Sequence, residues 1–149
     1  MGKVMTYRSL SKRQAAILAA IGRGLIPSGG SYFALGAADV EKQWLSRVDY
    51  NLSRMPFFTR VGLKWLLYGL DYLWPLLVIR KTAPLRHLNE RTLAHLLHKA
   101  ENTGVSGAAF MTVIKILVFP AFYGLKEVQQ AIGYSTKFPL REDFKGTKE

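Results

Sequence analysis

Three side chains that can bind metal ions, His95, His98 and Glu101, recur at intervals of three residues in the second half of the chain. In a helix this spacing puts them on one face, where two neutral imidazoles and a carboxylate can hold one ion. A closed zinc site needs a fourth ligand, and the position of His87 in the sequence does not place it beside them. We therefore expect a solvated polar face, on which His98 and Glu101 pair weakly, and no metal site.

Two pairs of glycines near the N-terminus raise the question of a phosphate-binding loop. Gly22 and Gly24 are separated by one residue, and Gly29 and Gly30 follow shortly after. A nucleotide-binding loop would follow a strand and would end in Lys-Ser or Lys-Thr, and this stretch has neither feature. We interpret it as the end of a helix followed by a turn.

Catalytic residues are not indicated by any short motif that pairs a nucleophile with a base or two carboxylates in a cleft. The chain contains no cysteine, which excludes disulfides, thiol chemistry and cysteine-ligated metal clusters. Four acidic residues stand singly among basic neighbours and are expected on a solvated or ion-paired surface: Asp39, Glu41, Asp49 and Asp71. The sequence thus predicts no catalytic residue, no metal ligand and no cofactor in this chain.

The elements that would position these residues are all helices. Apolar residues recur at helical spacing, and prolines and glycines mark the breaks between segments. The expected helices run from a Ser9 or Ser11 cap to Leu25, from Leu35 to Met55, from Pro56 to Ile79, onward from an Asn89 cap, from Phe110 to Leu125 with an end or kink at Pro120, and from Leu125 to Ile132 with Gly133 closing the last. We expect an all-α single domain of five or six helices over residues 1–134, with a polar tail over 135–149.

The helices around Leu63–Ile79 and Ala108–Phe119 are the most hydrophobic, and we expect them at the centre of the domain. The first carries a narrow polar stripe and is interrupted by two charges and Pro75, which disfavours a membrane span. Its aromatic residues, with cations on both sides, are typical of a helix lying in the membrane interface: Trp65, Tyr68, Tyr72 and Trp74. An aromatic core helix with a proline kink explains the same pattern.

The net charge of +11 predicts attraction to anionic lipid, nucleic acid or an acidic partner. The basic residues are spread over both halves of the chain and form no dense basic helix or arm. A nucleic-acid-binding module usually shows such a cluster beside aromatic residues that stack on bases. We therefore expect no nucleic-acid partner.

Both ends of the chain carry a family resemblance. Near the C-terminus an aliphatic helix is followed by Phe122, Tyr123, Val128, Ala131, Ile132, Gly133 and Tyr134. Near the N-terminus the matching residues are Leu10, Ser11, Arg13, Gln14, Leu18, Ala19, Ile21, Leu25, Ile26 and Pro27. Together they cover about a third of the chain and resemble the gluconate 2-dehydrogenase subunit 3 family, and a similar segment opens some membrane-associated glucose-methanol-choline flavoprotein oxidoreductases.

This resemblance implies a small helical companion of a larger flavoprotein oxidoreductase subunit that holds FAD and often passes electrons to a haem protein. Family members commonly carry a twin-arginine export signal and a longer polar loop after the first helix, and the present sequence shows neither. The resemblance thus leads us to expect a membrane-associated protein, on the cytoplasmic side because no export signal is seen.

We expect a non-catalytic accessory subunit that stabilises a flavin-dependent dehydrogenase of the glucose-methanol-choline type and helps to hold it at a membrane. The alternative is a stand-alone peripheral membrane or lipid-binding helical protein. Eight residues are expected to contact the partner or the membrane: Trp65, Tyr68, Tyr72, Trp74, Phe119, Phe122, Tyr123 and Tyr134.

Overall fold

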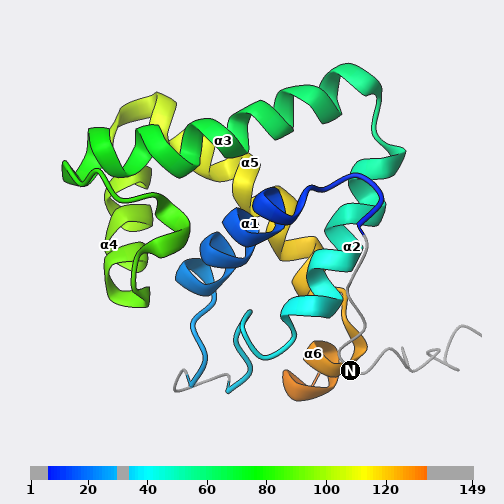
Figure 1. The fold of residues 1–149 in the computed structure, drawn as a ribbon. Helices are drawn as coiled ribbons and strands as arrows, with labels where there is room; N and C mark the ends of the chain where they lie inside the picture. Colours follow the sequence, from blue (N-terminus) through cyan, green and yellow to red (C-terminus); the bar gives the residue numbers. More distant parts are fainter. Residues whose placement is uncertain (1–6, 30–33, 134–149) are drawn as a thin grey trace, which may run out of the picture.

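The computed structural model describes residues 7–29 and 34–133, and these form an all-α single domain (Figure 1). Tyr134 and the expected polar tail lie outside the described residues. Within the described ranges there are six α-helices, one 3₁₀ turn and no strand. The elements are α1 (Lys12–Leu25), α2 (Glu41–Arg54), α3 (Phe57–Ile79), the 3₁₀ turn η1 (Leu85–His87), α4 (Glu90–Glu101), α5 (Gly104–Tyr123) and α6 (Lys126–Ala131). The predicted fold class is confirmed.

Helix α1 lies in the middle of the domain, with α3 above it, α2 to one side and α4 to the other (Figure 1). Its start is fixed by a capping box, in which the Ser11 hydroxyl accepts from the Gln14 N–H and the Gln14 side chain accepts from the Ser11 N–H. Eight of its 14 residues are buried, against four of 23 in α3. Thus α3 and α5 contribute to the core, but α1 is the helix that the others enclose.

The second helix begins at Glu41, six residues later than the sequence indicated. The residues before it form a turn, because the Asp39 carboxylate accepts hydrogen bonds from the Gly36 N–H at 2.7 Å and the Ser28 hydroxyl at 2.8 Å. These two hydrogen bonds lower the pKa of Asp39. This turn, stabilised by the Asp39 side chain, competes successfully with helix formation, which the apolar periodicity from Leu35 onward did not reveal.

Neither internal proline ends its helix. Helix α3 continues through Pro75 to Ile79, and α5 continues three residues beyond Pro120 to Tyr123. The sixth helix is closed by Gly133 at a φ of +71°, in the left-handed conformation that the sequence predicted.

Asp49 is buried and not on the surface, which corrects the sequence-based expectation. Its carboxylate accepts hydrogen bonds from three successive backbone N–H groups, those of Arg8 at 2.7 Å, Ser9 at 2.8 Å and Leu10 at 2.7 Å. The bond from Leu10 is buried and satisfies a donor that would otherwise be buried without a partner, and the other two bonds are partly buried. The chain entering α1 is thereby held against α2.

Candidate docking face

The outer side of α3 presents large apolar side chains to solvent. Phe58 is 86% exposed, Trp65 is 73% exposed and Leu77 is 71% exposed. Phe58, Trp65 and Tyr72 are seven residues, or about two turns, apart, and Leu76 follows Tyr72 by four, so these residues share one side of the helix. We call this surface the α3 face, and it consists of Phe57, Phe58, Trp65, Tyr72, Leu73, Leu76 and Leu77.

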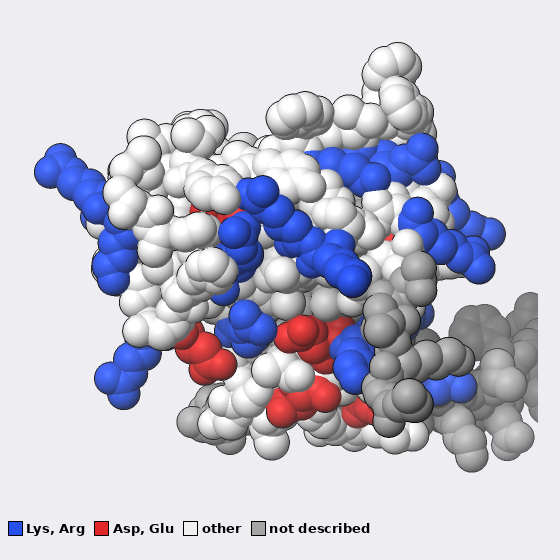
Figure 2. Space-filling view, in the orientation of Figure 1, with Lys and Arg blue, Asp and Glu red and all other residues white. Residues whose placement is uncertain are grey.

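Basic side chains border the α3 face. The Arg60 guanidinium lies 5.9 Å from the centre of the Phe57 ring, and the Arg13 guanidinium lies 5.0 Å from that of Tyr72. Figure 2 shows uncharged side chains along the upper margin, over α3, and a band of Lys and Arg just below them. Most of the Asp and Glu atoms visible in that view lie in the lower half of the molecule. An apolar ridge with a cationic border matches the chemistry of an anionic membrane surface.

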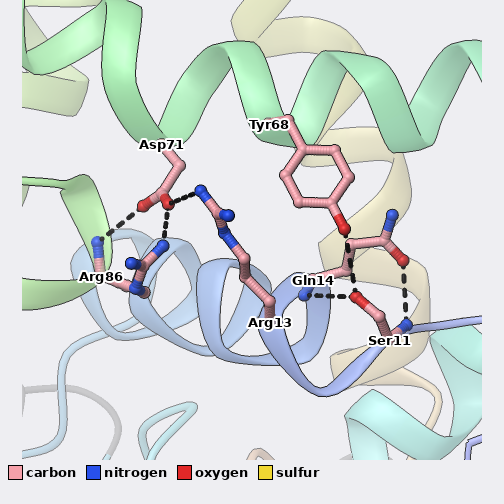
Figure 3. A network of polar contacts seen from close by, with 6 residues as sticks. All are labelled: Ser11, Arg13, Gln14, Tyr68, Asp71 and Arg86. Carbon is pink, nitrogen blue, oxygen red and sulfur yellow. Dashed lines mark hydrogen bonds and ion pairs between the residues drawn. The ribbon is translucent and has the colours of Figure 1, made fainter.

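Asp71, the one acidic residue of α3, is neutralised inside the protein (Figure 3). It is fully buried and forms ion pairs with Arg13, at 3.5 Å, and with Arg86. The Arg86 backbone N–H also donates to its Oδ1 atom at 3.3 Å. Asp71 is thus ion-paired, as the sequence suggested, but lies in the interior and not on the surface. It joins α3 to α1 and η1, and α3 presents no acidic group to solvent.

Tyr68 extends this polar contact between α3 and α1. Its hydroxyl lies 3.4 Å from the Ser11 hydroxyl, and the Arg13 guanidinium lies 5.1 Å from the centre of its ring. Figure 3 shows Arg13 reaching up from α1 between the Asp71 and Tyr68 positions on α3. The capped start of α1 therefore also fixes the underside of α3.

A second apolar surface lies on α5 and connects with α3 through a groove. Val105 is 88% exposed and Ile116 is 67% exposed. The groove has a volume of about 230 Å³ and is lined by Asn51, Met55, Thr59, Leu63, Val113, Ile116 and Leu117. Its walls come from α2, α3 and α5, so the exposed apolar surface continues from α3 to α5.

Among the described residues, α5 is the one helix long and apolar enough to cross a membrane. Only 39% of its most apolar stretch is buried inside the protein. Core helices of globular proteins reach the same length and hydropathy, and α5 packs against α2 and α4. Length and composition therefore establish no span.

The residues predicted to make contacts differ in their exposure. Trp65, Tyr72 and Tyr123 are exposed, Tyr68, Trp74 and Phe119 are half-buried, Phe122 is fully buried, and Tyr134 lies outside the described residues. The Trp74 ring stacks on that of Phe110 at 4.7 Å, on the inner side of α3. The exposed aliphatic residues Leu73, Leu76 and Leu77 were missed. Leu76 follows Trp65 by about three turns and therefore lies on the same side of the helix as that ring.

His95 and His98 do not converge on one site. His95 lines a hollow between the end of α3 and α4, whereas His98 lines a different hollow between α4 and α5. Glu101 pairs with Lys115 at 2.6 Å. In the part of the chain that the structure describes, no three His, Asp or Glu side chains lie close enough together to hold a metal ion.

Comparisons of the chain with protein-family models, with curated proteins and with solved structures found no match. The exposed surfaces of the molecule and the sequence resemblance are therefore the available indications of function. Of these surfaces, the α3 face combines the largest exposed apolar side chains with a border of cations.

Proposed function

We propose that this protein is a non-catalytic accessory subunit that stabilises a flavin-dependent dehydrogenase of the glucose-methanol-choline type and helps to hold it at a membrane. The observation that carries the proposal is the α3 face, whose apolar side chains are left in water by the fold. Complete burial of a Leu or Phe side chain contributes roughly 1.5–3 kcal/mol. Covering several of them at once provides ample free energy for association.

The membrane part of the proposal is supported by charge. The border of the α3 face is basic. Asp71, the one acidic residue of α3, is buried in ion pairs and is not part of this face. Each Lys or Arg near an anionic membrane surface contributes about 1 kcal/mol to attraction. Insertion of Trp65 and Leu77 into the headgroup region removes apolar side chains from water and places the bordering cations beside the lipid phosphates.

The partner part of the proposal is supported by the sequence resemblance. The N-terminal half of the resembling pattern includes Arg13 and Gln14, which connect α1 to α3 and cap α1. The C-terminal half includes Phe122, which is buried, and Tyr123, which is exposed. The pattern thus contains residues that support the fold and exposed residues, such as Tyr123, that can contact the flavoprotein.

The test is a pull-down of the tagged full chain from the cells that naturally produce it, in mild detergent. We expect the eluate to contain a larger oxidoreductase chain and to show flavin absorbance. A double variant, Trp65→Ala with Leu77→Ala, should reduce recovery of the chain with the membrane fraction before detergent is added. Its matched control, Tyr50→Ala with Ile132→Ala, removes exposed apolar groups outside the α3 face. The control should leave recovery with the membrane fraction unchanged. A single colourless chain from the unmodified protein would refute the accessory-subunit proposal.

A second candidate is a stand-alone peripheral membrane or lipid-binding protein, favoured by the groove between α2, α3 and α5. Its walls include Met55, Leu63, Val113 and Ile116, which match the chemistry of an acyl chain. This candidate predicts extractable lipid and no flavin in the same eluate. The two functions are therefore separated by one purification.

A further inference from the structure

A hollow of about 390 Å³ lies between the end of α3 and the side of α4, and its walls are strongly basic. It is lined by Ile79, Lys81, Arg91, Thr92, His95 and Lys99. Three of these residues carry a permanent positive charge, and no Asp or Glu is among them. Figure 2 shows Lys and Arg side chains at the left margin, where Figure 1 places the end of α3 and α4.

The backbone holds these side chains together from two elements. Arg91, His95 and Lys99 are spaced four apart along α4 and therefore share one side of that helix. Lys81 follows the end of α3, where Arg80 takes a left-handed conformation at a φ of +54° and the Lys81 N–H donates to the Pro75 carbonyl at 3.0 Å. This sharp turn brings Lys81 to the wall opposite α4.

The positive charge of this hollow is not compensated within the described part of the protein. Lys81, Arg91 and Lys99 form no ion pair there, whereas Arg23 pairs with Glu41 and Lys115 pairs with Glu101. The like charges of Lys81, Arg91 and Lys99, gathered around one hollow, repel one another. A cluster of this kind is stabilised when an anion enters it.

The residues and their surroundings indicate which anion. A guanidinium with two ammonium groups is the typical environment of a phosphate, which accepts hydrogen bonds from several directions. Leu76 and Leu77, in the last turn of α3, are exposed at the α3 face immediately before the residues that line the hollow. A phosphate bound in the hollow therefore has an apolar surface beside it for attached hydrocarbon chains.

We propose that the hollow binds the phosphate group of an anionic phospholipid, with Lys81, Arg91 and Lys99 contacting the phosphate and the acyl chains lying against Leu77. This inference rests on the proposed attachment to a membrane and assigns its headgroup site. It also sets an orientation, because the end of α3 and the adjoining side of α4 then lie at the headgroup level together with the α3 face.

The test measures co-sedimentation of the full chain with vesicles of phosphatidylcholine alone and of phosphatidylcholine mixed with phosphatidylglycerol, whose only charge is its phosphate. The hollow variant carries alanine at the three cationic positions, Lys81, Arg91 and Lys99. The matched control replaces Arg8, Lys42 and Lys126, which are exposed cations of the same composition outside the hollow and the α3 face. The helix content and the thermal midpoint of both variants are checked by circular dichroism, and we expect neither to change because all six side chains are exposed.

We expect the unmodified chain to prefer the anionic vesicles. The hollow variant should bind them about 100-fold more weakly, from roughly 1 kcal/mol per contacting cation. The control should lose less than about threefold, because charges more than a Debye length of about 8 Å from the lipid are screened. Soluble short-chain phosphatidylglycerol should shift the amide NMR signals of residues around the hollow at lower concentrations than inorganic phosphate does.

Three outcomes would overturn the inference, and they differ in what they imply. Equal losses in the hollow variant and the control would mean that only overall charge matters, and the proposed membrane attachment would stand. Inorganic phosphate binding the hollow as well as the short-chain lipid, with vesicle binding unchanged in the hollow variant, would make it a site for free phosphate. Absence of binding by the unmodified chain to either vesicle would refute the membrane attachment itself.

Discussion

Helices α1 and α3 lie against each other but use their apolar residues in opposite ways. Helix α1 has three charged residues among 14 and still buries eight positions. Helix α3 has three charged residues among 23, is the more apolar of the two, and buries only four. The more hydrophobic helix is thus the one with more side chains in water.

This difference indicates that the apolar residues of the two helices serve two purposes, core packing in α1 and an external contact in α3. The core of the domain needs one enclosed helix, and the residues of α1 satisfy that need with side chains as small as alanine. Helix α3 contributes Leu67 and Leu70 to the same core but carries a further row of Phe, Trp and Leu that the fold does not require. Because exposed apolar rows lower solubility, we infer that the second row is retained for an external contact.

The largest effect is expected from removing the same side chain from each helix. Leu18 on α1 is completely buried, and Leu77 on α3 is 71% exposed. Leu18→Ala should lower the free energy of unfolding by about 2–5 kcal/mol, because it leaves a cavity. Leu77→Ala should change it by less than about 0.5 kcal/mol. Chemical denaturation of the two variants measures both values.

Equal losses at the two leucines would contradict the comparison, since they would mean that the α3 face is covered in solution. Analytical ultracentrifugation of the unmodified chain distinguishes the reason, because a covered face in the isolated protein requires self-association. A monomer with a strongly destabilised Leu77→Ala variant would show that Leu77 belongs to the core and not to the α3 face.

A smaller effect is expected at the contact that joins the two helices. Asp71→Asn removes the charge that holds Arg13 and Arg86, and leaves two guanidinium groups near a neutral amide. Breaking a fully buried ion pair costs about 3–5 kcal/mol, but both arginines are partly solvated, so we expect a loss of about 2 kcal/mol. The matched change Arg13→Gln removes the more exposed partner and should cost less than about 1 kcal/mol. Thermal unfolding at neutral pH gives both differences, and a larger loss for Arg13→Gln would show that Arg86 alone does not hold the carboxylate.

Much of the fold could be predicted from local signals. The Ser11 and Asn89 caps, the Gly133 terminus and the apolar periodicity of each segment are short-range features, and the structure confirms them. The predicted start of α2 was wrong because the Asp39 carboxylate accepts hydrogen bonds that stabilise a turn before the helix. The apolar pattern continues through that turn and does not reveal it.

The surface was harder to predict, for a different physical reason. Periodicity shows that α3 is apolar on most sides but not which side the rest of the chain covers. Trp65 and Trp74 were grouped as contact residues, yet they lie on opposite sides of α3, one exposed and one stacked on Phe110. Burial of Asp49 and Asp71 depends on partners about 40 residues away from the first and up to 58 from the second, which no local pattern contains.

The smallest effect is expected from adding one methyl group to each helix, and it should have opposite signs. A Cβ atom at Gly22 on α1 would lie 2.6 Å from the Cζ2 atom of Trp44, whose ring is fully buried. Gly22→Ala should therefore destabilise the protein by about 1 kcal/mol, since the strain of overpacking exceeds the gain in helix propensity. At Gly62 on α3 no atom lies within 4 Å of the added Cβ, and Gly62→Ala should stabilise by roughly 0.5–1 kcal/mol. Denaturant midpoints for the two variants measure both changes in stability. A destabilising effect of Gly62→Ala would show that another group packs against the α3 face at this position.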